Sequence, residues 1–335
     1  MGDIIDRLLS SPEPSIRYQM RVRVLGESKD SPDVQQLRQE IRASERVKGL
    51  LCSRDEKGRV TPVQHTYRKW KGAHWVLARL ADIGYPEGEV ELRPVMEQVI
   101  RGHCPEKPVV DKRRDLRGEY EYRDGVAVIN GQPRICASIP AYVLFSATRL
   151  GFVDERCKRL AEKLISVQWP DGGWNCDRNP EANHSSFWET LIPLRALAAY
   201  AAHTSDQPAG EAAARAAEVF LKRRLFRRQS NGQIMDPAFG QLHYPCYWRY
   251  DILFALKVMA EAGHISDERC GEALDLLESK RLSDGGWPAE ARFYRVSNDF
   301  ASGTEWVSWG QCSGKRMNEW VTADALYVLK AAGRL

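Results

Sequence analysis

The sequence predicts an all-α protein whose helices alternate between an inner and an outer ring, an α/α toroid. The first observation is a repeated signature. Asp-Glu-Arg-Cys at 154–157 is followed by Asp-Gly-Gly-Trp at 171–174, and both strings recur at 267–270 and 284–287 with the same spacing. Eight residues rarely keep such a register by chance, so the chain consists of repeated units. The second observation is an alternation of apolar and amphipathic helical segments along the chain.

Each unit consists of an apolar helix that ends at a glycine, an amphipathic helix, a turn and a tryptophan. In the first copy Leu160, Leu164 and Val167 are spaced by four and three residues, which places them on one face of a helix. An Asp-Glu pair begins this helix, where carboxylates suit the positive end of the helix dipole. Asp-Gly-Gly ends it with residues that tolerate positive φ, and the Trp anchors the returning chain by burying a large ring.

The same template finds further copies with weaker signatures. The apolar segments, expected to form the inner ring, are Pro14–Gly26, His65–Gly84, Cys136–Gly151, His184–Ala202, Pro245–Gly263 and Met317–Gly333. The amphipathic segments, expected outside, are Asp3–Leu9, Asp33–Leu51, Glu89–Gly102, Asp154–Gln168, Glu211–Arg224 and Asp267–Arg281. About six such hairpins can close into a ring, which leaves no terminal repeat uncovered. We therefore expect one toroid domain over residues 1–335.

Composition narrows the class of protein. The chain of 335 residues is 43% hydrophobic, which allows a sizeable core, and its formal net charge of +4 is mild. It shows neither a secretory signal nor an apolar run that could span a bilayer. Eight cysteines without paired spacing fit free thiols in a reducing compartment. The aromatic residues are not interleaved with a basic stripe, so no nucleic acid is expected as a partner. These patterns predict a cytoplasmic protein without a transmembrane segment.

One segment departs from the helical pattern. Residues 104–133 combine a basic cluster with Asp-Gly and Asn-Gly turn signals, which predicts an inserted loop with a short hairpin around Tyr120–Ile129. Long loops in compact domains are often functional, so we expect this insertion to act as a lid.

Two stretches resemble a known superfamily. Residues 168–174 (Gln-Trp-Pro-Asp-Gly-Gly-Trp), preceded by Arg159, resemble the QW repeat of squalene–hopene and oxidosqualene cyclases, and Arg281 stands in place of the Gln in the second copy. Residues 184–188 (His-Ser-Ser-Phe-Trp) look like the start of an inner helix in protein prenyltransferase β subunits. The resemblance implies a central cavity for an isoprenoid-derived or other apolar substrate. The DxDD and DDxxD motifs of terpene cyclases and synthases are missing, so the chain most resembles short, single-toroid squalene cyclase-like proteins.

Thiols and imidazoles precede several inner helices. Loops that lead into these helices gather at one end of a toroid, so residues far apart in sequence converge there. Sulfur and nitrogen ligands favour zinc, and prenyltransferase β subunits place an Asp, a Cys and a His at comparable positions. The alternative is that the cysteines are free thiols packed as small hydrophobes. The sequence predicts zinc as the cofactor, with five candidate ligands: Cys136, Cys176, His184, His243 and Cys246.

Acids beside tryptophans form the second group of candidates. A carboxyl group desolvated against aromatic walls has a raised pKa and can donate a proton, while the rings stabilise a carbocation. The alternative is that the acids pair with Arg195 or Arg249 inside the barrel. The residues expected to act as acid or base are Asp177, His184, Glu189 and Asp251.

The segment from His65 to Trp75 is too rich in rings and charge to be a simple apolar packing face. It indicates a wall that binds a ligand through both rings and charge, including an anion. The alternative is that part of it serves the core. The expected substrate-binding residues are Tyr67, Lys69, Trp70, His74, Arg134, Trp188, Trp248 and Arg249.

These patterns lead to two functional hypotheses. The first is an enzyme of the terpene cyclase and prenyltransferase type, which binds a small, largely apolar substrate and promotes cyclisation or transfer by an acid or a metal. The second is a non-catalytic toroid that binds a small molecule or a protein partner. GxGxxG, GxxxxGK[ST], HExxH and GxSxG motifs are missing from the sequence, which removes support for nucleotide, zincin and serine-hydrolase chemistry. A deep pocket with ordered acids favours the enzyme, and a filled centre favours the binding protein.

Overall fold

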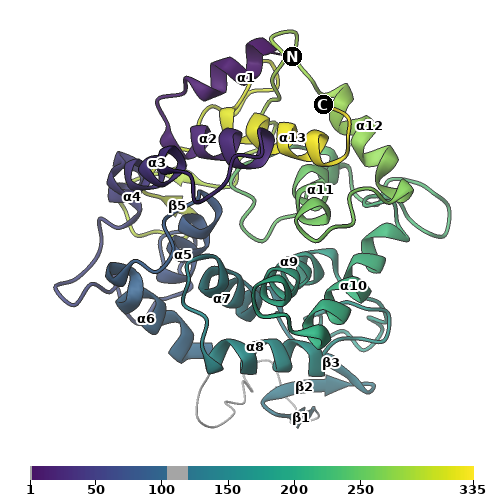
Figure 1. The fold of residues 1–335 in the computed structure, drawn as a ribbon. Coiled ribbons are helices and arrows are strands. Elements are labelled where there is room, and N and C mark those ends of the chain that lie inside the picture. Colours follow the sequence, from purple (N-terminus) through teal and green to yellow (C-terminus); the bar gives the residue numbers. More distant parts are fainter. Residues whose placement is uncertain (1, 104–119) are drawn as a thin grey trace.

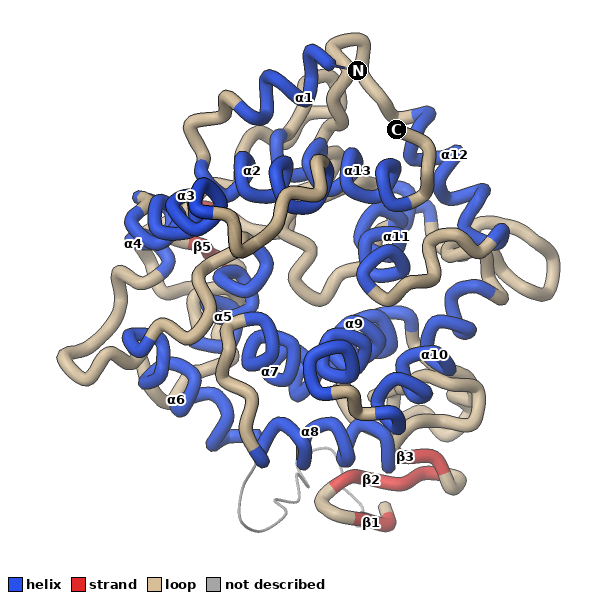
Figure 2. The backbone as a smooth tube through the Cα atoms, in the orientation of Figure 1, coloured by secondary structure: helices blue, strands red, loops and turns tan. Residues whose placement is uncertain are grey.

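The computed structural model describes residues 2–103 and 120–335, whose helices form two concentric rings (Figures 1 and 2). The inner ring contains α2 (Pro14–Gln19) with its π-helical continuation η1 (Met20–Val24), α5 (Ala73–Asp82), α7 (Ser138–Arg149), α9 (Phe187–Thr204), α11 (Ile252–Glu261) and α13 (Glu319–Ala331). The outer ring contains α1 (Gly2–Leu9), α3 (Pro32–Ala43), α4 (Glu45–Leu50), α6 (Arg93–His103), α8 (Glu155–Ser166), α10 (Gln207–Leu221) and α12 (Gly271–Ser279). The prediction of an all-α toroid is confirmed.

Contacts between neighbouring helices close the ring. Along the inner ring α5 packs on α7, α7 on α9, α9 on α11 and α11 on α13, and α13 then contacts α2. Outer helices cover the joints: α8 contacts both α7 and α9, and α6 contacts both α5 and α7. Figure 2 shows the first and last inner helices side by side. The hydrophobic core contains side chains of both rings, and the inner helix α11 is buried at every position from Ile252 to Met259, as a helix covered on more than one face should be.

The two copies of Asp-Gly-Gly-Trp make the same contacts. The indole N–H of Trp174 donates to the carbonyl oxygen of Leu164 (2.9 Å), and that of Trp287 donates to Leu277 (2.7 Å). Both indoles are fully buried. Each Trp therefore fixes the returning chain to the end of the preceding outer helix, as a large ring with one polar atom is suited to do.

The residue that differs between the copies keeps its role. Gln168 donates from its amide to the carbonyl oxygen of Gly172 (2.7 Å), and Arg281 donates from Nε to that of Gly285 (3.0 Å). These glycines have φ of 104° and 84°, a region that side chains with a Cβ rarely adopt. A side-chain donor four residues before the glycine thus holds the same turn in both repeats.

The Asp-Glu-Arg-Cys strings connect successive outer helices. Arg156 makes two hydrogen bonds of 2.7 Å to Glu97 on α6, and Arg269 makes two bonds of 2.9 and 3.0 Å to Glu218 on α10. Bidentate pairing of this kind gives a defined orientation as well as attraction. The 3-10 segment η4 (Glu268–Cys270) carries the second copy into α12. The repeat signature is therefore a device for joining repeats.

Capping side chains shift several helix boundaries from those predicted. Asp251 caps α11 by accepting from the backbone N–H of Phe254 (2.7 Å), so this helix begins at Ile252 rather than at Pro245. Ser44 accepts from the N–H of Val47 and divides the expected helix 33–51 into α3 and α4.

The largest boundary error concerns α5, which begins at Ala73 rather than at His65. Residues 65–72 form turns, and the N–H of Gly72 donates to the carbonyl of Arg68. Tyr67 and Trp70 are therefore not part of the helix, contrary to what the predicted segment implied. Both rings still contact Trp75 on α5.

Short strands accompany the rings. The segment β1 (Glu121–Arg123), β2 (Val126–Ile129) and β3 (Gln132–Arg134) forms an antiparallel sheet where a hairpin is predicted. In the long loop before α13, β4 (Arg295–Val296) pairs in parallel with β5 (Thr304–Glu305). Residues 104–119, which hold most of the expected lid, lie outside the described residues. In the described chain we find no helix with the length and apolar character that crossing a bilayer requires.

Candidate active site at the N-terminal face of the ring

The N-terminal face is the end of the ring at which the chain enters the inner helices. It comprises the segments 65–72, 134–137, 175–186, 242–251 and 288–318. These loops carry nearly all the side chains that the sequence singles out, and their contacts show which of them meet.

Four buried rings form an aromatic cluster at this face. Trp70 stacks on Tyr247 with ring centroids 3.7 Å apart, and Trp75 meets both edge-on at 4.8 and 5.7 Å. Tyr142 lies 5.6 Å from Trp75, and its hydroxyl donates to the carbonyl oxygen of Tyr247. Tyr247 adopts a φ of 48°, which costs about 1–3 kcal/mol in a residue other than glycine. The cluster and this hydrogen bond hold that backbone in place.

Tyr67 and His74 extend the aromatic cluster. Their rings lie 5.0 Å apart, and His74 is also 4.8 Å from Trp75. His74 is buried, and neither ring nitrogen has a hydrogen-bond partner among the described residues. Burial, together with the nearby His103 and Arg79, holds the pKa of His74 well below its usual range, so the ring is neutral.

Two cations and two indoles form a rim around the aromatic cluster. Lys69 Nζ lies 4.7 Å and the Arg249 guanidinium 5.0 Å from the ring centroid of Trp248. Trp188, which is 43% exposed, lies edge-on to Trp248 at 5.7 Å. Burial and the charge of Arg249 lower the pKa of Lys69. Among the described residues neither cation has a carboxylate within ion-pair distance, so the rim is positively charged.

Glu305 is the buried acid of this face. It is 1% exposed and forms no ion pair with any described residue. The hydroxyl of Tyr247 donates to Oε2 and the backbone N–H of Trp306 to Oε1, both at 2.9 Å. Burial raises the pKa of Glu305 to about 7, against these hydrogen bonds and the field of Arg79, which lower it. The carboxyl group is therefore partly protonated near neutral pH, behind the stacked rings of Trp70 and Tyr247.

Glu305 was not among the residues predicted from the sequence. It lies in the two-residue strand β5, which is too short to show a periodic pattern in the sequence, so no pattern indicates which way its side chain points. The available signal is its neighbours, since the stretch Glu-Trp-Val-Ser-Trp at 305–309 places one acid among indoles. An acid flanked by aromatic residues is a weak sign of burial, because rings are buried more often than charges.

Two predicted cysteines and one predicted acid meet beside Tyr67. The Sγ atoms of Cys136 and Cys176 and a carboxylate oxygen of Glu189 all lie within 4.8 Å of one another. Cys176 Sγ lies 3.4 Å from Glu189 Oε1, and the backbone N–H of Ser138 donates to Oε2 at 3.0 Å. A hydrogen bond with Cys136 and then burial raise the pKa of the Cys176 thiol, so it is protonated without a metal.

A second cluster contains His243, Cys246 and Asp251, all of them buried. Asp251 Oδ2 lies 2.7 Å from His243 Nδ1 and also accepts from the backbone N–H of His243, while Oδ1 caps α11. Two ligands of one tetrahedral zinc ion with bonds of about 2.0–2.1 Å stand about 3.3 Å apart. The shorter distance is that of a hydrogen bond, so this cluster is a helix cap that orients the imidazole.

Asp177, His184 and Arg134 lie apart from these clusters. Asp177 is exposed and accepts from the N–H of Asn179, and His184 is exposed with Nδ1 2.8 Å from Asn183. Arg134 donates to the carbonyl of Ala182 and lies 4.7 Å from the ring of Trp169. Asp177 and His184 line a surface pocket of about 760 Å³ that Cys176 and Trp188 also reach.

Ion pairs fill the ring beneath the N-terminal face. Arg195 bonds Asp82 (2.7 Å) and Glu261 (2.5 Å), and Lys257 lies 2.8 Å from Asp324. Four of these side chains are at most 6% exposed and Glu261 is 19% exposed. The alternative in which Arg195 pairs with Glu189 is not what the structure shows, because Arg195 is already held by Asp82 and Glu261.

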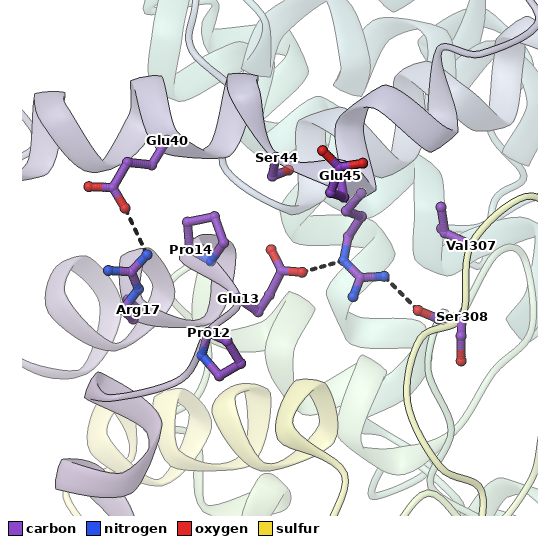
Figure 3. Close-up of a pocket in the computed structure, with 10 residues that line it drawn as sticks. Pro12, Glu13, Pro14, Arg17, Glu40, Ser44, Glu45, Val307 and Ser308 are labelled. Atoms are coloured by element: carbon purple, nitrogen blue, oxygen red, sulfur yellow. Dashed lines mark hydrogen bonds and ion pairs between the residues drawn. The ribbon is translucent and has the colours of Figure 1, made fainter.

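A further surface pocket of about 550 Å³ lies where α2, α3 and α4 meet the loop before α13 (Figure 3). Its charged side chains are already paired: Arg17 with Glu40 (2.7 Å) and Arg46 with Glu13 (2.6 Å). Arg46 also donates to the carbonyl of Ser308 at 2.6 Å. This pocket is part of the seam that closes the ring.

Comparisons with known proteins give similarities at the level of the whole chain. No family model and no curated protein matches the sequence. Among solved structures, a protein from Actinoplanes is 17% identical, with a TM-score of 0.46, over 99% of this chain and 98% of that one. Two structures of the type II terpene cyclase MstE from Scytonema, with its substrate geranylgeranyl dihydroxybenzoate, are 14% identical over the whole of both chains, with TM-scores of 0.42 and 0.41. Because these sequence identities and TM-scores are low, the function has to be inferred from the site itself.

Proposed function

We propose that this protein is an enzyme that protonates a largely apolar substrate at the N-terminal face, with Glu305 as the acid. The observation that carries the proposal is a carboxyl group that is 1% exposed, lacks a cationic partner among the described residues and lies behind stacked aromatic rings. A general acid works best when its pKa is near the working pH. The pKa of Glu305, raised by burial to about 7, meets that condition.

The aromatic cluster suits the intermediate that such an acid would generate. Protonation of an alkene uses its π electrons to form a C–H bond, which leaves Glu305 as carboxylate and a carbocation on the adjacent carbon. The face of an aromatic ring carries the negative side of its quadrupole and stabilises a nearby cation, and this cluster already holds one, since the Arg79 guanidinium lies 5.0 Å from the ring centroid of Tyr247. A second alkene of the same molecule can then attack the cation, and loss of a proton gives a cyclic isomer and restores the proton balance.

The rim suits a substrate with a polar or anionic end. Lys69 and Arg249 stand beside exposed indole surface, so an apolar chain can enter over Trp188 and Trp248 while its head group stays with the cations. This arrangement supports an isoprenoid-derived substrate that carries an acidic group.

Zinc fits one of the two thiol clusters. The 3.4 Å between Cys176 Sγ and Glu189 Oε1 agrees with the about 3.5 Å expected for sulfur and oxygen ligands at bond lengths of about 2.3 and 2.0 Å on a tetrahedral ion. Cys136, Cys176 and Glu189 would hold the ion and leave a fourth position open. A bound zinc ion would supply a Lewis acid that polarises an oxygen atom of the substrate.

Elemental analysis of protein purified without a metal-affinity tag tests the zinc site. About one equivalent of zinc, lost in Cys176→Ser and kept in Cys246→Ser, supports it. A metal-free protein, or zinc lost only in Cys246→Ser, contradicts it.

The filled ring interior favours the second hypothesis, a toroid that binds without catalysis. The ion pairs around Arg195 occupy the place where a deep apolar cavity is expected. Both hypotheses place the ligand at the N-terminal face, so a measurement of turnover separates them.

The decisive experiment is turnover in D₂O with a panel of polyprenyl probes, with geranylgeranyl dihydroxybenzoate as the acidic member and squalene as the neutral one. Acid-initiated cyclisation gives an isomer of changed retention time that carries one solvent deuteron. We expect Glu305→Gln to abolish this product and Glu290→Gln, which alters an acid paired with Lys280 away from the site, to keep it. Turnover by Glu305→Gln contradicts the acid, and saturable binding without turnover supports the binding protein.

A further inference from the structure

A pocket of about 460 Å³ lies at the end of the ring opposite the N-terminal face. It lies at the C-terminal ends of the inner helices. Its lining includes Arg149, the last residue of α7, Glu261, the last residue of α11, and Tyr327 on α13. Its volume falls within the range of small-molecule sites, about 300–1,000 Å³.

Two of the cations that line this pocket are already neutralised. Glu261 accepts from Arg195 (2.5 Å) and from Arg23 (3.1 Å), and Arg195 also binds Asp82. Arg23 in addition lies 5.2 Å from the ring of Tyr327. The guanidinium groups of Arg195 and Arg23 are therefore already ion-paired and are not free to bind an anion.

Two other cations lining the pocket, Arg149 and Lys29, have no side-chain partner in the part of the chain that the structure describes. Neither the Arg149 guanidinium nor Lys29 Nζ makes a hydrogen bond or ion pair with any described residue. Glu87 also lines the pocket, but its carboxylate bonds Arg38 at 3.4 Å. Burial and then the charge of Arg23 lower the pKa of Arg149, and burial and then Arg149 lower that of Lys29. Lys29 is exposed and Arg149 is half-buried, and their like charges repel each other at this pocket.

Cations at helix C-termini often serve only to complement the helix dipole. That role explains the position of Arg149 at the end of α7, but it does not explain a second cation facing the same pocket. Like charges that share a site are costly unless something lies between them. We propose that this pocket binds a small oxyanion, a phosphate or carboxylate group, between Arg149 and Lys29. The proposal is independent of the chemistry at Glu305.

Calorimetric titration and thermal unfolding of the full chain test the site. Inorganic phosphate and succinate serve as the two probes, with sodium chloride keeping the ionic strength constant. We expect saturable binding of one anion per chain and a rise in Tm of about 2 °C at tenfold excess over Kd. A preference for phosphate identifies a phosphorylated ligand, and a preference for succinate a carboxylate. A rise that sodium chloride reproduces overturns the proposal.

Variants separate a binding role from a structural one. We expect Arg149→Gln to abolish the anion-dependent rise and Lys29→Gln to weaken binding about tenfold. Without anion, Arg149→Gln should unfold at the same or a higher temperature, because it removes the repulsion. Arg228→Gln, an exposed arginine far along the chain, serves as the control and should bind as the unaltered protein does. Unchanged binding by Arg149→Gln, or a lower Tm in that variant without anion, contradicts the proposal.

Discussion

The N-terminal face and the ring interior each bury a carboxyl group, and the two groups differ in their pKa. At the N-terminal face Glu305 has hydrogen-bond donors but no ion pair with a described residue, and burial raises its pKa to about 7. In the ring interior burial acts in the same direction on Glu261, but Arg195 and Arg23 override it and bring the pKa to about 2. The protonation state therefore follows from the partner and not from burial alone.

The difference separates a structural role from a chemical one. A carboxylate locked between cations keeps its charge at every physiological pH and cannot give up a proton it does not hold. A carboxyl group without a cation can be protonated and can lose that proton, which is what general acid catalysis needs. Two kinds of substitution test this difference. One removes the cation that pairs with the interior carboxylates, and the other replaces the acid at the N-terminal face.

Loss of the cation in the ring interior should have the largest effect. Arg195→Met leaves Asp82 and Glu261 without their shared partner in a buried site. We expect the free energy of unfolding to fall by about 3–5 kcal/mol, measured by urea denaturation. Arg224→Met, which breaks an exposed pair with Glu272, should cost less than about 1 kcal/mol. An equal loss of unfolding free energy in Arg195→Met and Arg224→Met would show that the interior ion pairs are not desolvated.

Substitution of the acid at the N-terminal face should stabilise the protein in a pH-dependent way. The folded-state pKa of Glu305 lies above its unfolded value. Its contribution to the free energy of unfolding is therefore fully present below about pH 4.5 and is lost as the pH rises through about 7. Glu305→Gln does not titrate and should gain about 3 kcal/mol relative to the unaltered protein above pH 7. Thermal unfolding at pH 4.5 and pH 8 measures the difference. A gain that is the same at both pH values would mean that the pKa is not raised.

The hydroxyl of Tyr247 should have a smaller effect. It donates to Glu305 Oε2 and so favours the carboxylate. We expect Tyr247→Phe to raise the pKa of Glu305 further, by about 1 pH unit, and to cost about 1 kcal/mol of stability. The pH profile of stability, compared with that of Glu305→Gln, reports the change. Tyr250→Phe, which removes a buried tyrosine hydroxyl bonded to Leu225, should leave that profile unchanged.

Removal of a rim cation should affect stability least. Lys69 has no carboxylate partner within ion-pair distance among the described residues, so Lys69→Gln should change the free energy of unfolding by less than about 0.5 kcal/mol. It should weaken binding of an acidic polyprenyl probe and leave a neutral one unaffected, as fluorescence of the nearby indoles can measure. Equal loss for both probes would remove the anion-binding role from the rim.

Sequence patterns predicted much of the candidate site, but not its acid. Lys69, Trp70, Trp188, Trp248 and Arg249 do meet, because loops that lead into the inner helices of a ring must converge. Four of the five expected metal ligands divide into two clusters and the fifth, His184, lies apart from both, since which side chains meet depends on their directions in irregular loops.

The sequence by itself determined the ring, its repeats and the face that carries the candidate chemistry. Helical periodicity and a recurring turn signature are local properties, and six copies of one unit leave closure as the way to bury their apolar faces. Only the tertiary structure decided that Glu305 is buried without an ion pair to any described residue, while Glu261 is held between Arg195 and Arg23. The partners of a buried charge come from distant segments, and the free energy of desolvation depends on all of them together.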